Sequence, residues 1–344
     1  MEFNDKLIMK NYLNNIIQGD CLKLFQDIPD NSVDVTFADP PFNLKKKYNG
    51  YKDSLEFQDY LKWCEQWIAE MVRVTKPTGS ILLHNIPKWL TYYTFYLNKM
   101  ADFKHWIAWD APTAPMGKSL QPSQYGILFY AKNKGENKFY EIRHPHKRCR
   151  KCDYLLKDYG GKKADLHPFG PLVSDVWTDI HRIKHNNKRD LHPCQLPLHL
   201  LDRLILMTTD ENDIVLDPFS GTGTTAISAK RLGRRYIGFE LDEKYVEISK
   251  EKLKEVKPNF KINDVWVGFY LNEIVTIRNN DWETLKQCFE VPKPIKKIDF
   301  EKIKLKKEFK IPNESKNITK CKKGVLQNEI HHQPLFPLLA MAGQ

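Results

Sequence analysis

The stretch from Asp213 to Glu240 restricts the fold more than any other part of the chain. Residues 213–217 and 235–240 are apolar runs typical of strands, and residues 224–232 between them have the apolar spacing of a helix. Two strands joined through a helix pair in parallel, whereas antiparallel strands can be joined by a short turn. The stretch therefore predicts an α/β fold with a mostly parallel sheet.

The same alternation of strands and helices extends over most of the chain and divides it into four parts. Residues 1–131 and 191–257 carry the alternation and are expected to form one core. Residues 132–190 are rich in Lys, Arg, His, Gly and Pro with little periodicity, which indicates an insertion. Residues 258–344 become Lys-rich and sparse in core side chains, which indicates a basic C-terminal appendage or tail. The predicted strands are 14–19, 32–38, 80–84, 105–109 and 125–131, the predicted helices are 22–28, 56–75, 89–100, 198–208 and 243–254, and residues 265–278 alternate like a hairpin.

Composition narrows the class of protein. The formal net charge of +11 over 344 residues favours a polyanionic partner, although a Lys-rich bias for solubility would look the same. Seven cysteines without regular spacing argue against a disulfide framework. Residues 1–10 lack the apolar segment of a signal peptide, and no apolar run approaches the ~18 residues of a membrane span. We expect a cytoplasmic protein.

A glycine turn joins the first strand of the opening stretch to its helix. Gly221 and Gly223 allow a sharp turn and a close approach to a ligand, and Glu240 follows about 20 residues later, where it can accept both ribose hydroxyls. Strand, turn, helix and downstream acid together predict a nucleoside-type ligand. The plainer alternative is a helix N-terminus after a tight turn.

Asp217, just before this turn, selects among nucleoside ligands. Its carboxylate would repel a pyrophosphate and attract a cationic ligand such as S-adenosylmethionine. No Lys follows the glycines as a phosphate-binding Walker loop requires. A nicotinamide enzyme remains the formal competitor.

A second motif, Asp39-Pro40-Pro41-Phe42, follows the strand at 32–38. Prolines stiffen the backbone and have no N–H group, so the motif offers two acceptors, the Asp39 carboxylate and the Pro40 carbonyl. Two acceptors beside the flat ring of Phe42 are suited to hold the exocyclic amino group of a nucleobase. The alternative is a Pro-Pro turn that ends a core strand.

These motifs, with His192-Pro-Cys-Gln-Leu-Pro197 between them, resemble the β class of DNA amino-methyltransferases. The family has the same order of catalytic motif, target-recognition insertion and cofactor motif, and the resemblance covers about residues 14–254. It implies a Rossmann-like fold with a seven-stranded sheet and S-adenosylmethionine as the donor. The usual last residue of the tetrapeptide is Tyr, and Phe42 keeps the ring without the hydroxyl.

The resemblance also implies roles for parts and residues. Residues 1–131 would be the catalytic part, 132–190 the target-recognition insertion and 191–257 the cofactor-binding part. Catalysis is assigned to Asp39, Pro40, Pro41 and Phe42. Cofactor binding is assigned to Asp20, Cys21, His192, Pro193, Asp217, Pro218, Phe219, Ser220, Gly221, Gly223, Thr224 and Glu240.

The implied activity is site-specific methylation of double-stranded DNA at an exocyclic amine, on a base that must be flipped out of the duplex. By family habit Asp39 favours adenine N6, with cytosine N4 as the alternative. We expect the modification enzyme of a restriction–modification pair, with a cognate endonuclease as a possible partner and a homodimer as a possible assembly. A nucleic-acid-binding protein without activity is a more remote reading.

The insertion carries two further patterns, and the motif at 192–197 carries one. A basic run with interleaved tyrosines is suited to DNA contact, although a solvated face would look similar. Cys149 and Cys152, with His144 and His146, could hold a structural zinc, although a basic turn is the plainer reading. Cys194 resembles a cytosine-C5 nucleophile, but that family places its Cys after the cofactor motif. The basic run comprises Arg143, Lys147, Arg148, Arg150, Lys151, Lys162 and Lys163.

Overall fold

A computed structural model gives the architecture of the chain, which divides into two compact units. The first unit comprises Met1–Tyr140 and Ser174–Asn259, and the second comprises Glu141–Val173 and Phe260–Gln344. The structure describes residues 9–44, 47–48, 51–111, 120–143, 171–180, 182–183, 195–256, 275–277, 289–290 and 304–305.

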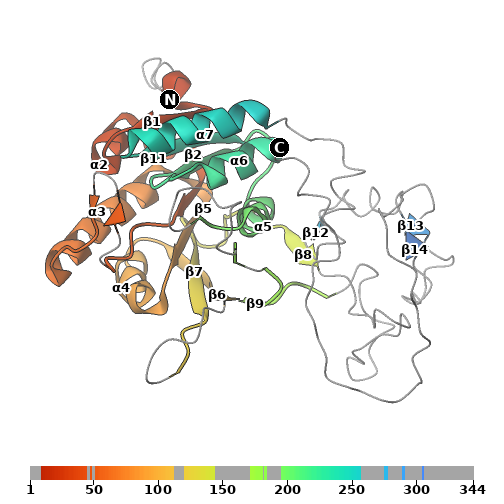
Figure 1. Ribbon diagram of the computed structural model, residues 1–344. Helices are drawn as coiled ribbons and strands as arrows, with labels where there is room; N and C mark the ends of the chain where they lie inside the picture. The colour runs from red at the N-terminus through yellow and green to blue at the C-terminus, as the bar shows by residue number, and fades with distance from the viewer. Residues whose placement is uncertain are drawn as a thin grey trace. The chain divides into compact units, whose positions relative to one another are not determined.

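An eight-stranded sheet forms the centre of the first unit (Figure 1). All its strand pairs are parallel except those of β7, which runs antiparallel to both of its neighbours, β5 and β6. The mostly parallel α/β sheet predicted from the sequence is therefore confirmed. Its strand order is β1 (Asn15–Gln18), β11 (Arg235–Glu240), β10 (Ile214–Asp217), β2 (Val33–Ala38), β5 (Thr75–Asn85), β7 (Gln124–Ala131), β6 (Asp102–Asp110) and β9 (Val176–Trp177).

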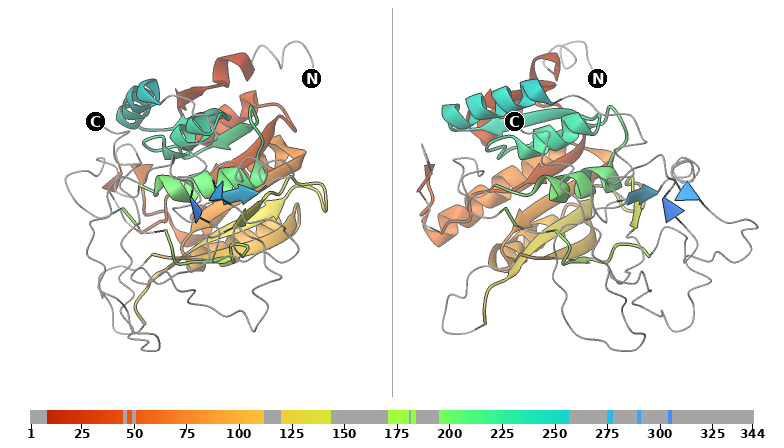
Figure 2. Two further views of the ribbon diagram at one scale, coloured as in Figure 1. Left: turned by 90° about the vertical axis from the view of Figure 1, so that its right-hand side faces the viewer. Right: turned by 45° about the vertical axis from the view of Figure 1, so that its right-hand side comes forward.

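Helices lie on both sides of this sheet (Figure 2). Along β5, Ile81 and Leu83 belong to one core cluster with residues of α2, α3 and α4, whereas the buried Leu82 between them is not part of that cluster. Alternate residues of a strand point to opposite faces, so the sheet has a packed core on each side. The helices are α2 (Cys21–Leu24), followed by the 3-10 turn Phe25–Asp27, then α3 (Phe57–Val74), α4 (Pro87–Leu97), α5 (Leu198–Thr208), α6 (Thr224–Arg231) and α7 (Glu243–Glu255).

The amphipathic pattern of α3 explains how the helix packs on the sheet. Tyr60, Cys64, Trp67 and Met71 recur at intervals of four, three and four residues, and all four are fully buried. The helix ends as predicted near Thr75, but β5 begins there at once, so Pro77 and Gly79 lie inside a strand that we expected to begin at Ser80. A register shift between Val33 and Val35 in the pairing of β2 with β5 accommodates this stretch.

Strand β9 is the eighth strand of the sheet, and the sequence pattern did not predict it. It pairs in parallel with β6, and Trp177 is 2% exposed. The Trp109 indole donates to the Ile180 carbonyl at 2.7 Å. Arg203 of α5, fully buried, pairs with Asp179 and lies over the Trp177 ring. Residues 174–180 thus pack as part of the first unit, within the stretch that the sequence assigned to an insertion.

The second unit contains short antiparallel pairs in its described residues. Strand β8 (Glu141–Arg143) pairs with β12 (Val275–Ile277), and β13 (Phe289–Glu290) pairs with β14 (Lys304–Leu305). Most of the hairpin expected at 265–278 lies outside the described residues, and its described part, β12, pairs with β8. Among the described helices of the whole chain, none is both long and apolar enough to cross a bilayer.

Candidate active site

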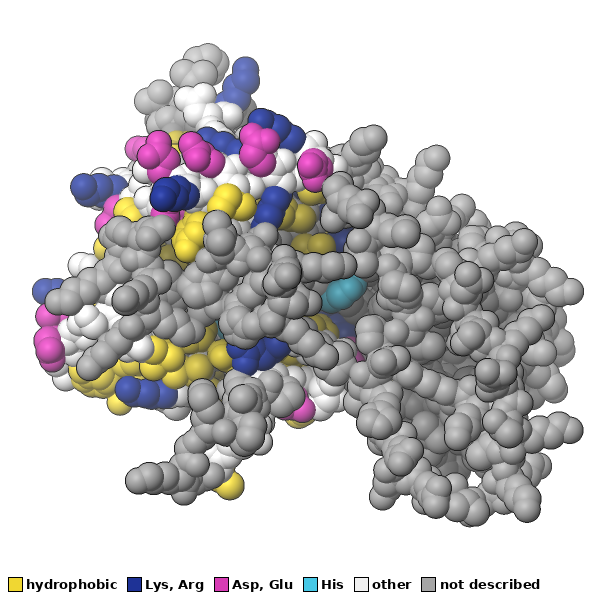
Figure 3. Space-filling view, in the orientation of Figure 1, with side chains coloured by type: hydrophobic (Ala, Val, Ile, Leu, Met, Phe, Trp, Pro, Cys, Tyr) yellow, Lys and Arg dark blue, Asp and Glu magenta, His cyan; other side chains and the backbone are white. Residues whose placement is uncertain are grey.

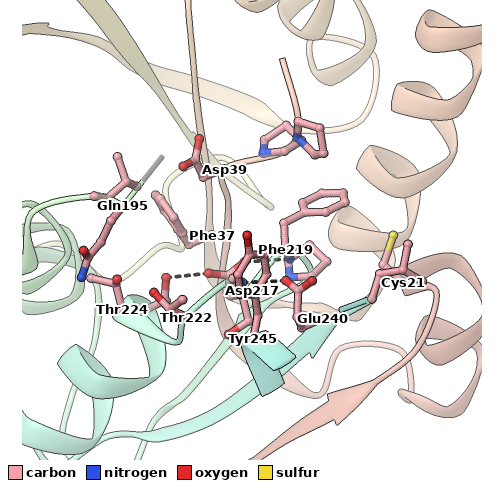
Figure 4. A pocket seen from close by; sticks show the side chains of 18 of the residues that line it. Cys21, Phe37, Asp39, Gln195, Asp217, Phe219, Thr222, Thr224, Glu240 and Tyr245 are labelled. Carbon is pink, nitrogen blue, oxygen red and sulfur yellow. Dashed lines mark hydrogen bonds between the residues drawn. The ribbon is translucent and has the colours of Figure 1, made fainter. Parts of the chain in front are cut away.

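Strand register brings the two sequence motifs to one edge of the sheet. β2 and β10 are parallel neighbours, with Val35 opposite Val215 and Thr36 opposite Leu216. Asp39 follows the end of β2, and Asp217 ends β10, so both carboxylates emerge at the same edge. Figure 4 shows both side chains among the residues that line one pocket.

The charge of this cavity has one sign. Four carboxylates line it, and none of its described lining residues is Lys, Arg or His. Such a cavity attracts a cationic ligand and disfavours a pyrophosphate. The four acidic residues are Asp20, Asp39, Asp217 and Glu240.

The acceptors of the Asp39–Phe42 motif are divided between internal donors and the cavity. The Tyr60 hydroxyl donates to the Pro41 carbonyl at 2.6 Å, and the Trp89 indole donates to the Phe42 carbonyl at 2.6 Å. Within the described part of the chain, no group donates to the Pro40 carbonyl. Asp39 and Pro40 both line the cavity, so the Pro40 carbonyl and one oxygen of the Asp39 carboxylate are the acceptors of the motif with no described donor.

Asp39 has a partner that the sequence analysis missed. One carboxylate oxygen, Oδ1, lies 2.7 Å from Nδ1 of His84 on β5. The sequence placed His84 in a buried strand but gave it no role. Because a parallel neighbour sits beside each strand residue, strand pairing could have indicated this contact once β2 and β5 were known to be adjacent.

The segment after Phe42 is tied back to the start of α3. Asp53, 2% exposed, accepts from the backbone N–H groups of Asn43 and Leu44 at 2.7 and 3.0 Å. The Asn43 side chain exchanges two hydrogen bonds with the Leu55 backbone. These contacts close the base of the loop that carries the short hairpin β3 (Lys47–Tyr48) and β4 (Tyr51–Lys52), and they fix where the motif ends.

The glycine turn holds the acid that follows it. Gly221 and Gly223 have φ of 52° and 81°, which side-chain-bearing residues rarely adopt. The Gly221 N–H donates to Glu240 Oε2 at 2.8 Å, and the Asp242 N–H donates to Glu240 Oε1 at 2.9 Å. Both carboxylate oxygens keep further lone pairs, so Glu240 is oriented for a ligand with two hydroxyls.

Asp217 is buried at the centre of the site. It accepts from the Phe219 N–H at 2.9 Å and from the Thr225 hydroxyl at 2.6 Å. The pKa of Asp217 is raised to about 7, mainly by burial and to a smaller extent by the charges of Asp39 and Glu240, while the two hydrogen bonds act in the opposite direction. A bound cation would relieve this cost by favouring the charged form.

Asp20 and Cys21 reach the cavity from the start of α2. The Asp20 side chain accepts from the Leu22 N–H at 2.8 Å and so caps the helix. Burial raises the pKa of the Cys21 thiol to about 12, with a smaller contribution from Asp20. The thiol therefore stays protonated near neutral pH and is no nucleophile.

Most of the predicted site residues meet at this cavity. Gly223 shapes the turn without lining the cavity, and the lining also includes residues that we did not predict, among them Trp63 of α3. His192, Pro193 and Cys194 lie outside the described residues, as do the zinc candidates and the basic run, apart from the backbone of Arg143. The predicted residues that line the cavity are Asp20, Cys21, Asp39, Pro40, Pro41, Phe42, Asp217, Pro218, Phe219, Ser220, Gly221, Thr224 and Glu240.

Comparison with known families decides what kind of protein carries this site. Residues 33–251, which include both motifs, match the family described as DNA methylase, N6_N4_Mtase. The chain belongs to this family. The resemblance inferred from the sequence motifs is thereby confirmed.

Several relatives agree with this assignment, and a solved structure shares the fold. The type II methyltransferase M.BamHI of Bacillus amyloliquefaciens is 43% identical over 76% of this chain, and the match spans 63% of the length of that enzyme. M.BglII of Bacillus subtilis is 34% identical over 70% of this chain and 69% of its own, and M1.MboII of Moraxella bovis is 31% identical over 72% and 99%. A putative DNA modification methylase of Thermus thermophilus, complexed with S-adenosyl-L-methionine, shares the fold, with a TM-score of 0.50 and 23% identity over 72% of this chain and 95% of its own.

Proposed function

We propose that this protein transfers a methyl group from S-adenosylmethionine to the exocyclic amino group of a flipped-out base in double-stranded DNA. The observation that carries the proposal is the pair of acceptors left open at Asp39 and Pro40, beside an acidic cavity with a glycine turn. An amino group conjugated to a base ring is a poor nucleophile. Accepting both of its N–H bonds favours a localised lone pair on nitrogen.

The described residues fit S-adenosylmethionine, which supplies an electrophilic methyl group on a sulfonium. Glu240, held by two backbone N–H groups, is placed for the ribose hydroxyls. A positive charge on the ligand would offset the cost of burying the charged form of Asp217. We assign Asp20 and Cys21 to the adenine ring, Pro218, Phe219, Ser220, Gly221, Gly223 and Thr224 to the turn around the ligand, and His192 and Pro193 to its methionine end.

The catalytic assignment is Asp39, Pro40, Pro41 and Phe42. Asp39 Oδ2 and the Pro40 carbonyl would accept the two N–H bonds of the amine. Asp39 would then take the proton that the methylated amine releases. Phe42 lines the cavity and would contact the flipped base, where stacking on an aromatic ring contributes about 1–3 kcal/mol. The chain thus acts mainly by positioning and electrostatics.

Target recognition is assigned to the insertion, 132–190, with phosphate contacts from Arg143, Lys147, Arg148, Arg150, Lys151, Lys162 and Lys163. The core parts 1–131 and 191–257 would carry catalysis and cofactor binding, and 258–344 the basic appendage. Because several relatives are named as type II methyltransferases, we assign this protein to a restriction–modification pair, in the cytoplasm, with a cognate endonuclease acting on the same site.

Two amines fit the acceptor pair, adenine N6 and cytosine N4. We propose adenine N6 because Asp is the first residue of the motif. Cytosine N4 is the second candidate, because its amino group offers two N–H bonds to the same pair of acceptors.

Modification-sensitive sequencing of DNA from cells that express the protein tests the proposal. We expect one short sequence to carry an added methyl group on an exocyclic amine in every copy, absent from cells that express Asp39→Ala. The chemical identity of the modified base decides between the two candidates. Unmodified DNA despite soluble, folded protein would overturn the proposal.

A further inference from the structure

Asp39 and His84 lie side by side because of strand register. β2 and β5 are parallel, and Ala38 is opposite Leu83. The residues that follow these two, Asp39 after β2 and His84 in β5, are therefore neighbours across the sheet. The contact between Oδ1 and Nδ1 is 2.7 Å long. The His84 side chain is 2% exposed and that of Asp39 is 13% exposed. The hydrogen bond is therefore shielded from competing water.

The His84 ring is locked in place by three aromatic side chains. It stacks on Tyr125 of β7 with ring centroids 5.4 Å apart and planes at 18°. Trp109 of β6 and Phe42 of the motif contact it at 5.8 and 6.0 Å. A ring flip would take Nδ1 away from the carboxylate, and this close packing opposes it.

The surroundings also select one tautomer of the ring. A carboxylate only accepts, so a hydrogen bond to it requires the proton on Nδ1. Nε2 is buried, and no described group bonds to it. A proton on Nε2 would be a buried donor without an acceptor, which is costly, so the neutral ring keeps its proton on the side of Asp39.

We propose that His84 is a positioning residue for the methyl-transfer reaction: its Nδ1–H holds Asp39 Oδ1 and thereby aims Oδ2, together with the Pro40 carbonyl, at the amine. This inference rests on the proposed function. His84 touches neither cofactor nor base and acts only through Asp39. Fixing one carboxylate oxygen removes rotation about the Cβ–Cγ bond, and small losses of alignment cost about 100-fold in rate.

Variants of His84 separate the donor from the ring. His84→Asn keeps an N–H donor near the position of Nδ1, whereas His84→Phe keeps the aromatic packing and removes the donor. We expect His84→Phe to lower kcat about 100-fold, with KM for DNA and Kd for S-adenosylmethionine within about threefold of wild type. His84→Asn should recover most of kcat. His105→Phe is the matched control, because His105 is also a strand histidine stacked on an aromatic ring, Phe129, and its kcat should not change.

A second readout does not depend on activity. The ¹⁵N spectrum of the histidine rings at pH 8, with His84 identified by its loss in His84→Asn, should show a protonated Nδ1 and a bare Nε2. The preference should weaken in Asp39→Ala. Wild-type kcat in His84→Phe, a His84→Asn variant as slow as His84→Phe, or a proton on Nε2 would each overturn the inference. A wild-type protein that methylates no DNA while its ring shows the expected tautomer would instead overturn the proposed function.

Discussion

At the scale of single residues, the site is defined by which polar atoms are already engaged. Tyr60 and Trp89 occupy the carbonyls of Pro41 and Phe42, and His84 occupies one oxygen of Asp39. Buried polar groups are nearly always paired, so acceptors left open toward a cavity indicate a ligand that donates. A primary amine, with two N–H bonds, matches the two remaining acceptors.

Asp217 leads to a prediction on pH and stability. Its pKa is about 7 in the folded protein and about 4 when unfolded, so the folded state binds the extra proton between these values. Stability is therefore lost as pH rises through this window, and the loss is complete above about pH 7. The difference in unfolding free energy, Asp217→Asn minus wild type, should therefore be about 3 kcal/mol larger at pH 8 than at pH 5.

Urea unfolding of both proteins at pH 5 and pH 8 measures this difference. Groups that titrate in the same way in both proteins contribute equally to both free energies and cancel in the difference. At pH 8 a cationic cofactor should stabilise wild type more than Asp217→Asn, because it meets the charged carboxylate. Parallel stability curves for the two proteins would contradict the raised pKa.

At the scale of elements, long periodic segments could be predicted and short ones could not. α3 and α5 match their expected bounds within one residue, because eleven or more residues give a clear apolar period. The βαβ unit at 213–240 could be predicted because its glycines and acid have fixed spacing. These elements place Asp39 and the glycine turn at one edge, which is why the sequence could indicate much of the site.

What the sequence missed depends on contacts between distant segments. β9 has only two residues, too few for an apolar period. It is held by pairing with the edge of β6 and by the buried ion pair between the nearby Asp179 and Arg203 of α5. His84 likewise looks like an ordinary strand residue in the sequence. Only its contact with Asp39, which follows β2, indicates a role. Pairing of this kind cannot be obtained from local periodicity.

The ion pair between Asp179, two residues after β9, and Arg203 of α5 gives a stability prediction. Arg203 is fully buried and donates through Nη1 to Asp179 Oδ1 at 3.1 Å. Removing the carboxylate leaves a buried guanidinium without its counter-charge, so Asp179→Ala should lower the unfolding free energy by about 3 kcal/mol. Glu251→Ala breaks the exposed pair with Lys254 and should change it by less than about 1 kcal/mol. Equal effects in chemical denaturation would show that the pair does not anchor this segment.

At the scale of the whole molecule, the net charge of +11 contrasts with an acidic cavity. Over the upper part of the face in Figure 3, where α7 lies in Figure 1, acidic and basic side chains alternate. The excess of positive charge in the sequence is concentrated instead in stretches such as 143–163. The proposed function requires basic residues for DNA and an acidic cavity for a cationic cofactor, and the sequence places these two groups of residues on different segments.

Salt dependence of DNA binding tests the assignment of that basic run. Replacing Arg148, Arg150 and Lys151 with Ala should weaken binding and reduce the slope of log K against log salt by about 2–3, since each phosphate contact contributes about 0.9. Replacing the exposed Lys62, Lys244 and Lys250 on α3 and α7 removes the same charge and should leave the slope nearly unchanged. Equal slopes for both triple variants would mean that the run makes no phosphate contacts.

The proposed mechanism requires that Asp39 acts on the base and not on the cofactor. Transfer of a tritiated methyl group to DNA, measured beside calorimetric binding of S-adenosylmethionine, tests this with wild type and Asp39→Ala. We expect the variant to lose at least about 100-fold in transfer while its cofactor Kd stays within about threefold of wild type. Undiminished transfer by Asp39→Ala, or loss of cofactor binding in step with transfer, would contradict the account.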